Sequence, residues 1–221
     1  MQLPFLPPDA PLAFPDPSQA LQDPDGLLCA GADLSHARLL LAYRTGIFPW
    51  FNEGDPILWW SPSTRCVLPP ESMRINRSLR KVINRGEFEV RWDTAFSDVI
   101  AACAAPREGA PGTWINTDME QAYTLLHALG HAHSVECWQD EELVGGLYGV
   151  SIGPCFFGES MFSRRSNASK VALANLCQSG RYQLIDCQMP TEHLLGLGAQ
   201  TMPREGFLTL LAELLEIKPN S

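Results

Sequence analysis

Apolar residues recur at helical spacing in the first part of the chain and at alternate positions in a later part. Leu39, Leu40 and Tyr43 share one helical face between Ser35, a capping residue, and Gly46, a stopping residue, so we predict a helix there. The same spacing predicts further helices over residues 76–84, after Asp93, over 117–130, over 167–179 and from Pro203 onward. The third of these is expected to begin with a capping box, Thr117-Asp118-Met119-Glu120.

From Ser134 the period of the apolar residues changes to two, which is typical of half-buried strands. We predict strands over 134–138, 143–152, 155–161 and 183–188. Strands that follow one another without a helix pair as antiparallel neighbours, so the pattern predicts an α+β fold with a mixed, antiparallel-rich sheet. We expect a small domain over residues 1–84, with a proline-rich lead-in over 1–24, and the main domain over 85–221.

The composition is that of an ordinary globular protein, with 45% hydrophobic and 19% charged residues among 221 and a formal net charge of −9. Proteins that coat nucleic acid are basic because their cations neutralise phosphates, so any nucleic-acid contact here is expected to be small and local. No basic stretch precedes an apolar segment, and Gly and Pro interrupt the longest uncharged run, 143–158. Seven cysteines occur without a C-x-x-C pair. We therefore expect reduced thiols, a cytoplasmic location and no membrane partner.

Two polar side chains interrupt the apolar run Leu184–Gln188. In a strand, Asp186 and Gln188 would share one face and Cys187 would occupy the other. A buried Asp is rare without a partner, so this pair predicts a polar pocket in the sheet, with a structural hydrogen-bonded pair as the alternative. Cys187 has no histidine in its motif, and we expect a buried free thiol there rather than a nucleophile.

An acidic residue flanked by apolar ones marks the strand that ends near residue 161. Glu159 shares a face with Phe157 and Met161, so this face could hold a cationic ligand beside a hydrophobic one. The alternative is an ion pair with Arg164 or Arg165.

Two tryptophans and three histidines are further candidates for chemistry. Trp50 and Trp114 lie in segments rich in Pro and Gly, where a ring could stack on a base or anchor a small core. The histidines form an H-x3-H-x-H group at His127, His131 and His133, but Gly130 ends the predicted helix between the first two, so we expect no metal site.

A long ordered set of motifs runs from residue 25 to about residue 204. They are Asp25–Leu28, Tyr43-Arg44, Gly46–Phe51, Pro56–Pro62, Gly112–Ile115, His131–Glu136, Leu143–Val150, Gly158–Ser163, Asn167–Lys170 and Leu184–Gln188. This set resembles the leucyl/phenylalanyl-tRNA–protein transferase family of bacteria. The sequence departs from the family pattern at Ala32 and Thr64 and has Leu147 where methionine also occurs, which leaves the preference among Leu, Phe and Met open.

The resemblance implies a C-terminal domain similar to the GNAT acyltransferases behind the small N-terminal domain. It implies transfer of leucine or phenylalanine from the 3′ ends of leucyl-tRNA and phenylalanyl-tRNA to proteins with an N-terminal Arg or Lys, which creates an N-end rule degradation signal. An aminoacyl ester is already activated, and no GxxxxGK[ST] loop is present, so we expect neither nucleotide nor other cofactor. We expect a monomer.

The resemblance also implies roles for single residues. Trp50 and Trp114 would lie near the terminal adenosine, Glu159 would help to recognise substrate, and Asp186 and Gln188 would lie at the reacting centre. The side-chain pocket would be lined by Leu147, Phe156, Met161 and Leu173.

One helix face carries an organised basic stripe, made of Arg74, Arg77, Lys81 and Arg85. We expect this stripe to bind tRNA phosphates, with a solvated helix face as the alternative. Two other classes of function stay open: a CoA-dependent N-acetyltransferase, and a noncatalytic module that binds tRNA ends or degradation signals. Formation of the aminoacylated product distinguishes both from a transferase.

Overall fold

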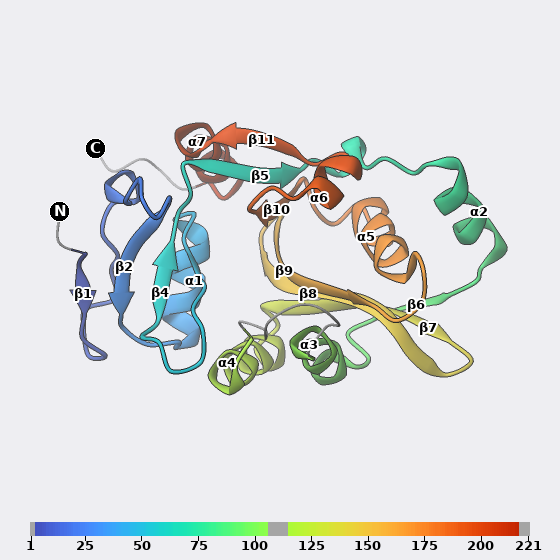
Figure 1. Ribbon diagram of the computed structural model, residues 1–221, viewed down its shortest axis with the longest axis horizontal. Coiled ribbons are helices and arrows are strands. Elements are labelled where there is room, and N and C mark those ends of the chain that lie inside the picture. The colour runs from blue at the N-terminus through green and yellow to red at the C-terminus, as the bar shows by residue number, and fades with distance from the viewer. Residues whose placement is uncertain (1–2, 106–114, 217–221) are drawn as a thin grey trace.

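Two β-sheets organise the chain in the computed structural model, which describes residues 3–105 and 115–216 (Figure 1). The smaller sheet has the order β1-β2-β4-β3 and the larger β11-β5-β10-β9-β8-β7-β6. No helix in the described ranges is long and apolar enough to cross a membrane.

The small sheet is built from short N-terminal strands beside helix α1 (His36–Arg44). The strands are β1 (Phe5–Leu6), β2 (Leu27–Gly31), β3 (Phe48–Pro49) and β4 (Leu58–Trp60). The proline-rich lead-in lacks many N–H donors, and its carbonyl groups find a donor in the buried side chain of Arg38. The guanidinium donates to the carbonyl groups of Ala10, Pro11 and Ala13 at 2.8 to 3.2 Å. This arginine therefore fixes the lead-in against the small sheet.

The large sheet is antiparallel between all described neighbours except β9 and β10, which run parallel. Its strands are β5 (Thr64–Leu68), β6 (Glu89–Trp92), β7 (Ala132–Gln139), β8 (Glu142–Ile152), β9 (Cys155–Ser163), β10 (Leu184–Gln188) and β11 (Gln200–Pro203). The predicted α+β class with a mixed, antiparallel-rich sheet is thus confirmed. Strand β5 precedes residue 84 but belongs to the large sheet.

Helices cover both faces of the large sheet (Figure 1). Helices α3 (Phe96–Ala104) and α4 (Thr117–Ala128) pack on one face, and α5 (Ala168–Gln178) packs on the other with α2 (Arg77–Arg85) beside it. Helix α7 (Arg204–Leu214) packs against β5 and β11, and α6 (Glu192–Gly196) follows β10. The two apolar layers that result form separate buried clusters on either side of the sheet.

The structure corrects one helix cap and adds elements that the pattern did not predict. The N-cap of α4 is Asn116, whose side chain accepts from the backbone of Met119 at 3.0 Å, and not the expected Thr117. Asparagine is the stronger cap of the two, which explains the shift by one residue. Strands β6 and β11 and helix α6 were not predicted, because each is short and none contains a fully buried residue that would mark an apolar face.

Gly149 is required by the close approach of β8 and β9, and this yields a testable prediction. A Cβ added there would lie 2.2 Å from the carbonyl oxygen of Phe157, so Gly149→Ala should destabilise the fold by about 1–3 kcal/mol. The matched control is Gly206→Ala on α7, where a Cβ meets nothing within 4 Å and helix propensity favours alanine. Urea unfolding of both variants checks this, and equal stability would contradict the tight contact.

Candidate active site

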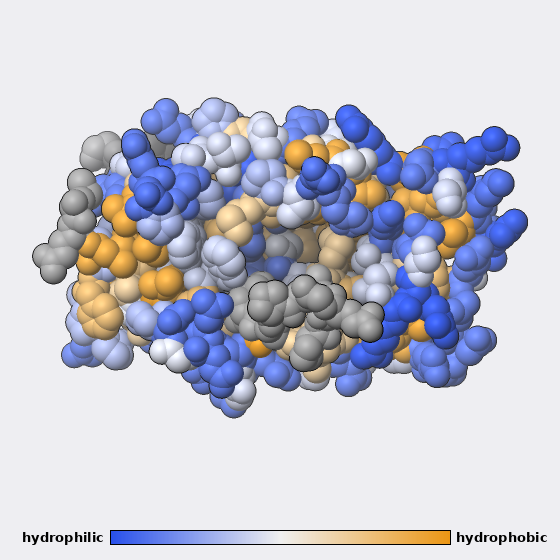
Figure 2. Space-filling model, in the orientation of Figure 1, coloured by the Kyte–Doolittle hydropathy of each residue, from blue (hydrophilic) through white to orange (hydrophobic). Residues whose placement is uncertain are grey.

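A cavity of about 440 Å³ opens where strands β9 and β10 part. The two strands pair only as far as Phe157 and Asp186. Immediately after this pair β9 bulges against β8: Gly149 faces Gly158 and Tyr148 faces Ser160, so that Glu159 is the extra residue. The surface is hollowed near the centre of the face in Figure 2, below the place of β10 and α6 in Figure 1. The bulge and the splayed strands together expose side chains that a regular sheet would bury.

The walls of the cavity are mainly apolar. Leu147, Phe156, Met161 and Leu173, four residues predicted to line a pocket, all line this cavity. Further apolar contacts come from Tyr148, Leu176, Ile185 and Leu194. The structure therefore brings together, from β8, β9 and α5, residues that are far apart in the sequence. A volume of this order suits a small ligand with an apolar group.

Glu159 is a buried carboxylate at one wall of the cavity. Its Oε1 accepts from Nε2 of Gln188 at 2.7 Å, and its Oε2 accepts from the hydroxyl of Tyr123 at 3.0 Å. The hydroxyl of Tyr43 is in turn hydrogen-bonded to that of Tyr123. Burial raises the pKa of Glu159 to about 7, against the opposite effect of hydrogen bonds from Tyr43 and Tyr123. This carboxyl group can therefore take up or release a proton near neutral pH.

The alternative role of Glu159, an ion pair with a following arginine, is absent from the described residues. Arg164 donates to the carbonyl oxygen of Leu143 at 3.1 Å and stacks over the ring of Phe162, and Arg165 is exposed. The two arginines lie beyond the end of β9, past the cavity. Glu159 thus faces the cavity without a cationic partner in the described chain.

The expectation that Asp186 and Gln188 share a face is wrong, because β10 is irregular. Gln188 has a φ of 61°, and the pairing with β5 shifts between Asp186 and Gln188. As a result Gln188 and Cys187 both line the cavity, and Asp186 does not. The Nε2 of Gln188 is engaged by Glu159, and no described residue donates to its Oε1. The amide oxygen is therefore free to accept from a ligand.

Asp186 forms a buried ion pair with Arg65, a residue that the sequence reading missed. Two guanidinium nitrogens donate to the two carboxylate oxygens at 2.8 and 2.6 Å, and both side chains are 1% exposed. Arg65 lies over the rings of Phe48 and Phe207, at 4.8 and 4.6 Å from their centroids. Asp186 also accepts from the backbone N–H of Gln188 at 2.9 Å. The pair therefore fixes the turn that presents Gln188.

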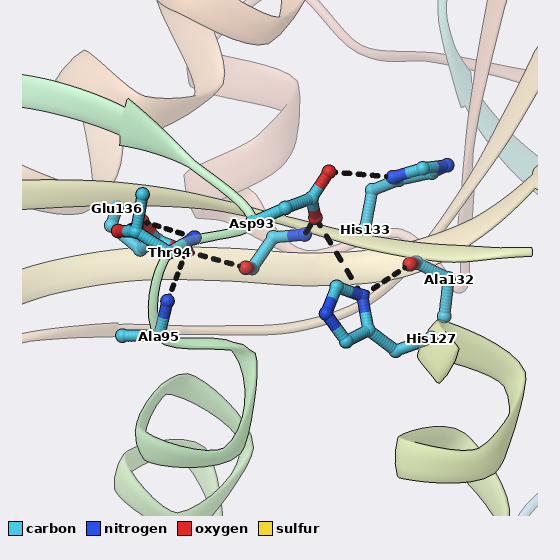
Figure 3. Close-up of polar contacts among 8 residues, drawn as sticks. Asp93, Thr94, Ala95, His127, Ala132, His133 and Glu136 are labelled. Atoms are coloured by element: carbon cyan, nitrogen blue, oxygen red, sulfur yellow. Dashed lines mark hydrogen bonds and ion pairs between the residues drawn. The ribbon is translucent and has the colours of Figure 1, made fainter. Parts of the chain in front are cut away.

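A second polar cluster involves two of the three histidines (Figure 3). Asp93 contacts Nδ1 of His133 at 2.8 Å and Nδ1 of His127 at 3.7 Å, and accepts from the backbone of Ser134 at 2.9 Å. The ring of His127 also stacks on that of Phe96. Within residues 3–105 and 115–216, no group of three or more metal-binding side chains is found.

Glu136 ties helix α3 to β7 in the same region (Figure 3). This buried carboxylate accepts from the backbone N–H groups of Thr94 and Ala95, at 3.1 and 3.2 Å, at the start of α3. Negative charge is favourable at a helix N-terminus. His127 lies on α4, one turn after Tyr123, and its contact with Asp93 fixes this end of the helix. The cluster therefore helps to keep the hydroxyl of Tyr123 within hydrogen-bond distance of Glu159.

Neither Trp50 nor the basic stripe is part of the cavity lining. Trp50 is 38% exposed and packs against Trp60, while Trp114 lies outside the described residues. The members of the basic stripe are exposed on or just before α2, at one end of the molecule in Figure 1: Arg74, Arg77, Lys81 and Arg85. Of these, Arg85 approaches Glu87 at 3.5 Å, a surface pair of little energetic weight.

Comparison with known proteins identifies the family. Residues 67–212 match the family described as leucyl/phenylalanyl-tRNA protein transferase, and residues 32–63 match its N-terminal domain. A leucyl/phenylalanyl-tRNA–protein transferase from Aromatoleum aromaticum is 62% identical over 90% of this chain and 85% of its own length. A protein of the same name from Nitrosomonas eutropha is 56% identical over 92% of this chain and 88% of its own length. A solved structure titled crystal structure of FemX matches at 10% identity and a TM-score of 0.48, over 79% of this chain and 70% of that chain.

Both parts of the chain match models of the same family, and relatives of that name align with nearly all of it. The chain belongs to the leucyl/phenylalanyl-tRNA–protein transferase family, whose members are aminoacyltransferases.

Proposed function

We propose that this protein transfers leucine or phenylalanine from aminoacyl-tRNA to the N-terminal Arg or Lys of acceptor proteins. The observation that carries the proposal is one cavity with apolar walls and a polar corner formed by Glu159 and Gln188. The apolar part suits the side chain of the transferred amino acid. The polar part suits the amine that attacks its ester.

The reaction joins the acceptor nitrogen to the ester carbonyl carbon and releases the 3′-hydroxyl of the tRNA, while the amine loses a proton. We propose that Glu159 receives this proton and passes it to the departing 3′-oxygen, because its pKa of about 7 lies near the pKa of ~8 of a free α-amine. The free amide oxygen of Gln188 is suited to accept a hydrogen bond from the same amine. Orientation of the two substrates supplies most of the remaining rate, since the ester is already activated.

Asp186 acts in this proposal through its neighbours. Both of its oxygens are occupied by Arg65, and one also holds the backbone of Gln188. In this proposal Asp186 is therefore a positioning residue for Gln188. The resemblance had implied a place for Asp186 at the reacting centre itself.

Size selection falls to the apolar walls. Leu147, Phe156, Met161 and Leu173 come from three elements, and the flexible side chain of Met161 allows ligands of different shape. We propose that leucine and phenylalanine are both accepted, and methionine as a third substrate. One methylene in such a pocket changes discrimination by only ~1–3 kcal/mol.

We propose that Trp50 and Trp114 receive the terminal adenosine and that the basic stripe on α2 contacts tRNA phosphates farther from the ester. The product would be an N-end rule degradation signal, made by a cytoplasmic monomer. An acidic protein can bind tRNA in this way because a single-stranded end needs stacking and few phosphate contacts.

The deciding experiment is transfer of labelled leucine from leucyl-tRNA to a peptide that begins with Arg. A peptide that begins with Asp serves as the control acceptor, and acetyl-CoA serves as the alternative donor. Label in the Arg peptide, and none in the control, supports the proposal. Acetylation of the peptide would favour a CoA-dependent acetyltransferase, and binding of both ligands without product would favour a noncatalytic module.

The basic stripe gives a prediction of its own. Replacing Arg77 and Lys81 together with alanine should weaken leucyl-tRNA binding and flatten its salt dependence by roughly one to two units of slope, about 0.9 or less per lost phosphate contact. Binding of the Arg peptide should be unchanged. The matched control is Arg44→Ala, an exposed arginine on α1. An unchanged slope in the double variant would make the stripe a solvated helix face.

A further inference from the structure

One lysine beside the cavity has a position that the proposed reaction does not use. Lys170 lies in the first turn of α5, three residues before Leu173 and six before Leu176. Both leucines line the cavity. Residues three apart on a helix share a face, so Lys170 lies on the cavity side, toward the N-terminal end of α5.

The ammonium of Lys170 has no acid partner in the described chain. Its side chain is half-buried, and within residues 3–105 and 115–216 it forms neither a hydrogen bond nor an ion pair. Partial burial of a charge is costly unless the charge has a partner. The alternative to a ligand-binding role is an ammonium that extends into solvent, because a lysine side chain can pack its methylene groups on an apolar surface while its charge stays hydrated.

A second nitrogen group, the imidazole of His193, lies within electrostatic reach of this lysine. His193 of α6 is exposed and lines the cavity. Its pKa is lowered by partial burial and by the positive charge of Lys170, so the ring and the ammonium lie within electrostatic reach of each other. A neutral imidazole can still donate one hydrogen bond. The pair thus presents one cation and one neutral donor at the edge of the cavity.

We propose that Lys170 and His193 bind a backbone phosphate of the single-stranded 3′ end of the tRNA. This inference rests on the proposed function. With the aminoacyl group inside the cavity, the ester and its ribose lie at the opening, and the next group along the strand is a phosphate. His193 lines this cavity, and Lys170 lies one turn before the lining residue Leu173 and acts electrostatically on His193, whereas no residue of the α2 stripe lines the cavity. Lys170 and His193 would therefore bind the 3′ end of the tRNA, and the basic stripe would bind a more distant part of it.

Three leucyl donors of decreasing length test this assignment: leucyl-tRNA, a leucyl ester of the cytidyl-cytidyl-adenosine trinucleotide, and leucyl-adenosine, which has no phosphate. Lys170→Met should lower kcat/KM about 10- to 100-fold with the first two donors, the range expected for a hydrogen bond to a charged group. It should leave leucyl-adenosine unchanged. Lys170→Arg should retain most activity with all three donors.

The stripe variant with Arg77 and Lys81 replaced is the matched control, and should lose activity with leucyl-tRNA but not with the trinucleotide ester. Equal loss by Lys170→Met with all three donors, or no loss with any, would overturn the subsite. Absence of product from the unaltered protein with every donor would instead overturn the proposed function. In that case the affinity for the non-acylated trinucleotide, measured by calorimetry, still tests the subsite. Weaker binding to Lys170→Met than to the unaltered protein supports the subsite, and equal binding refutes it.

Discussion

Glu159→Gln is expected to lower kcat/KM for transfer to an Arg-initiated peptide by about 100-fold or more, the effect of losing a general base. The amide keeps the shape of the carboxylate and can still accept from Tyr123, but it cannot take a proton at neutral pH. Binding of the tRNA end should change little. The measurement is kcat/KM with leucyl-tRNA and peptide varied in turn.

The pH dependence separates a proton acceptor from a mere ligand of the amine. The pKa of Glu159 is raised by burial to about 7, so kcat/KM of the unaltered protein should rise as pH passes through that value. The Glu159→Gln variant should lose this step and follow only the titration of the acceptor amine. Identical pH profiles for the two proteins would contradict the proposed role.

Stability should depend on the same carboxyl group. The pKa of Glu159 is about 7 in the folded protein, against 4.5 for a glutamate in water, so the folded state holds the proton more tightly. The resulting stabilisation is fully present below pH 4.5 and is lost as pH rises to about 7, a change of roughly 3 kcal/mol. Urea unfolding at pH 5 and pH 8 should therefore show a smaller pH dependence for Glu159→Gln than for the unaltered protein. Glu192→Gln, an exposed carboxyl on α6, is the matched control.

Local periodicity was enough to predict most of the long elements. Strands β7, β8 and β9 and helices α1 and α5 lie within a few residues of the predicted ranges, because each has a continuous apolar face that it buries against the sheet. Strand β11 has no such face, and its place is set by its pairing with β5. Pairing of this kind joins segments far apart in the chain, which a local pattern does not encode.

The site was predictable in its residue types and less so in its geometry. The acidic and amide groups of Glu159 and Gln188 were found as polar interruptions of apolar strands, and both line the cavity. The alternating pattern wrongly placed Asp186 on the same face as Gln188, because a bulge in β10 and the positive φ of Gln188 break the period of two. Tyr43 and Tyr123 were missed because they reach Glu159 from helices. The signal for Arg65 was available, since a cation inside the buried run of β5 requires an acid.

Replacing Asp186 with alanine is expected to destabilise the fold by about 3–5 kcal/mol, because it leaves the guanidinium of Arg65 buried without its partner. Activity should fall as well, but unfolding alone could cause that loss. A double variant, Arg65→Met with Asp186→Leu, removes both charges and fills the space with apolar groups. Replacement of a buried ion pair in this way is often neutral or stabilising, so the double variant should regain most of the stability in urea unfolding.

The double variant should nevertheless transfer leucine more slowly than the unaltered protein, by at least about tenfold in kcat, since the backbone N–H of Gln188 loses the oxygen that it donates to at 2.9 Å. Without that bond the strained conformation at Gln188, with its φ of 61°, is no longer held, and its side chain leaves Glu159 for part of the time. Asp186→Asn keeps an acceptor oxygen for this N–H and should retain more activity per folded molecule than Asp186→Ala. Full activity in the folded double variant would mean that Asp186 only balances the charge of Arg65. A loss of kcat with unchanged KM for leucyl-tRNA would instead assign to the ion pair the task of holding Gln188 at the polar corner of the cavity.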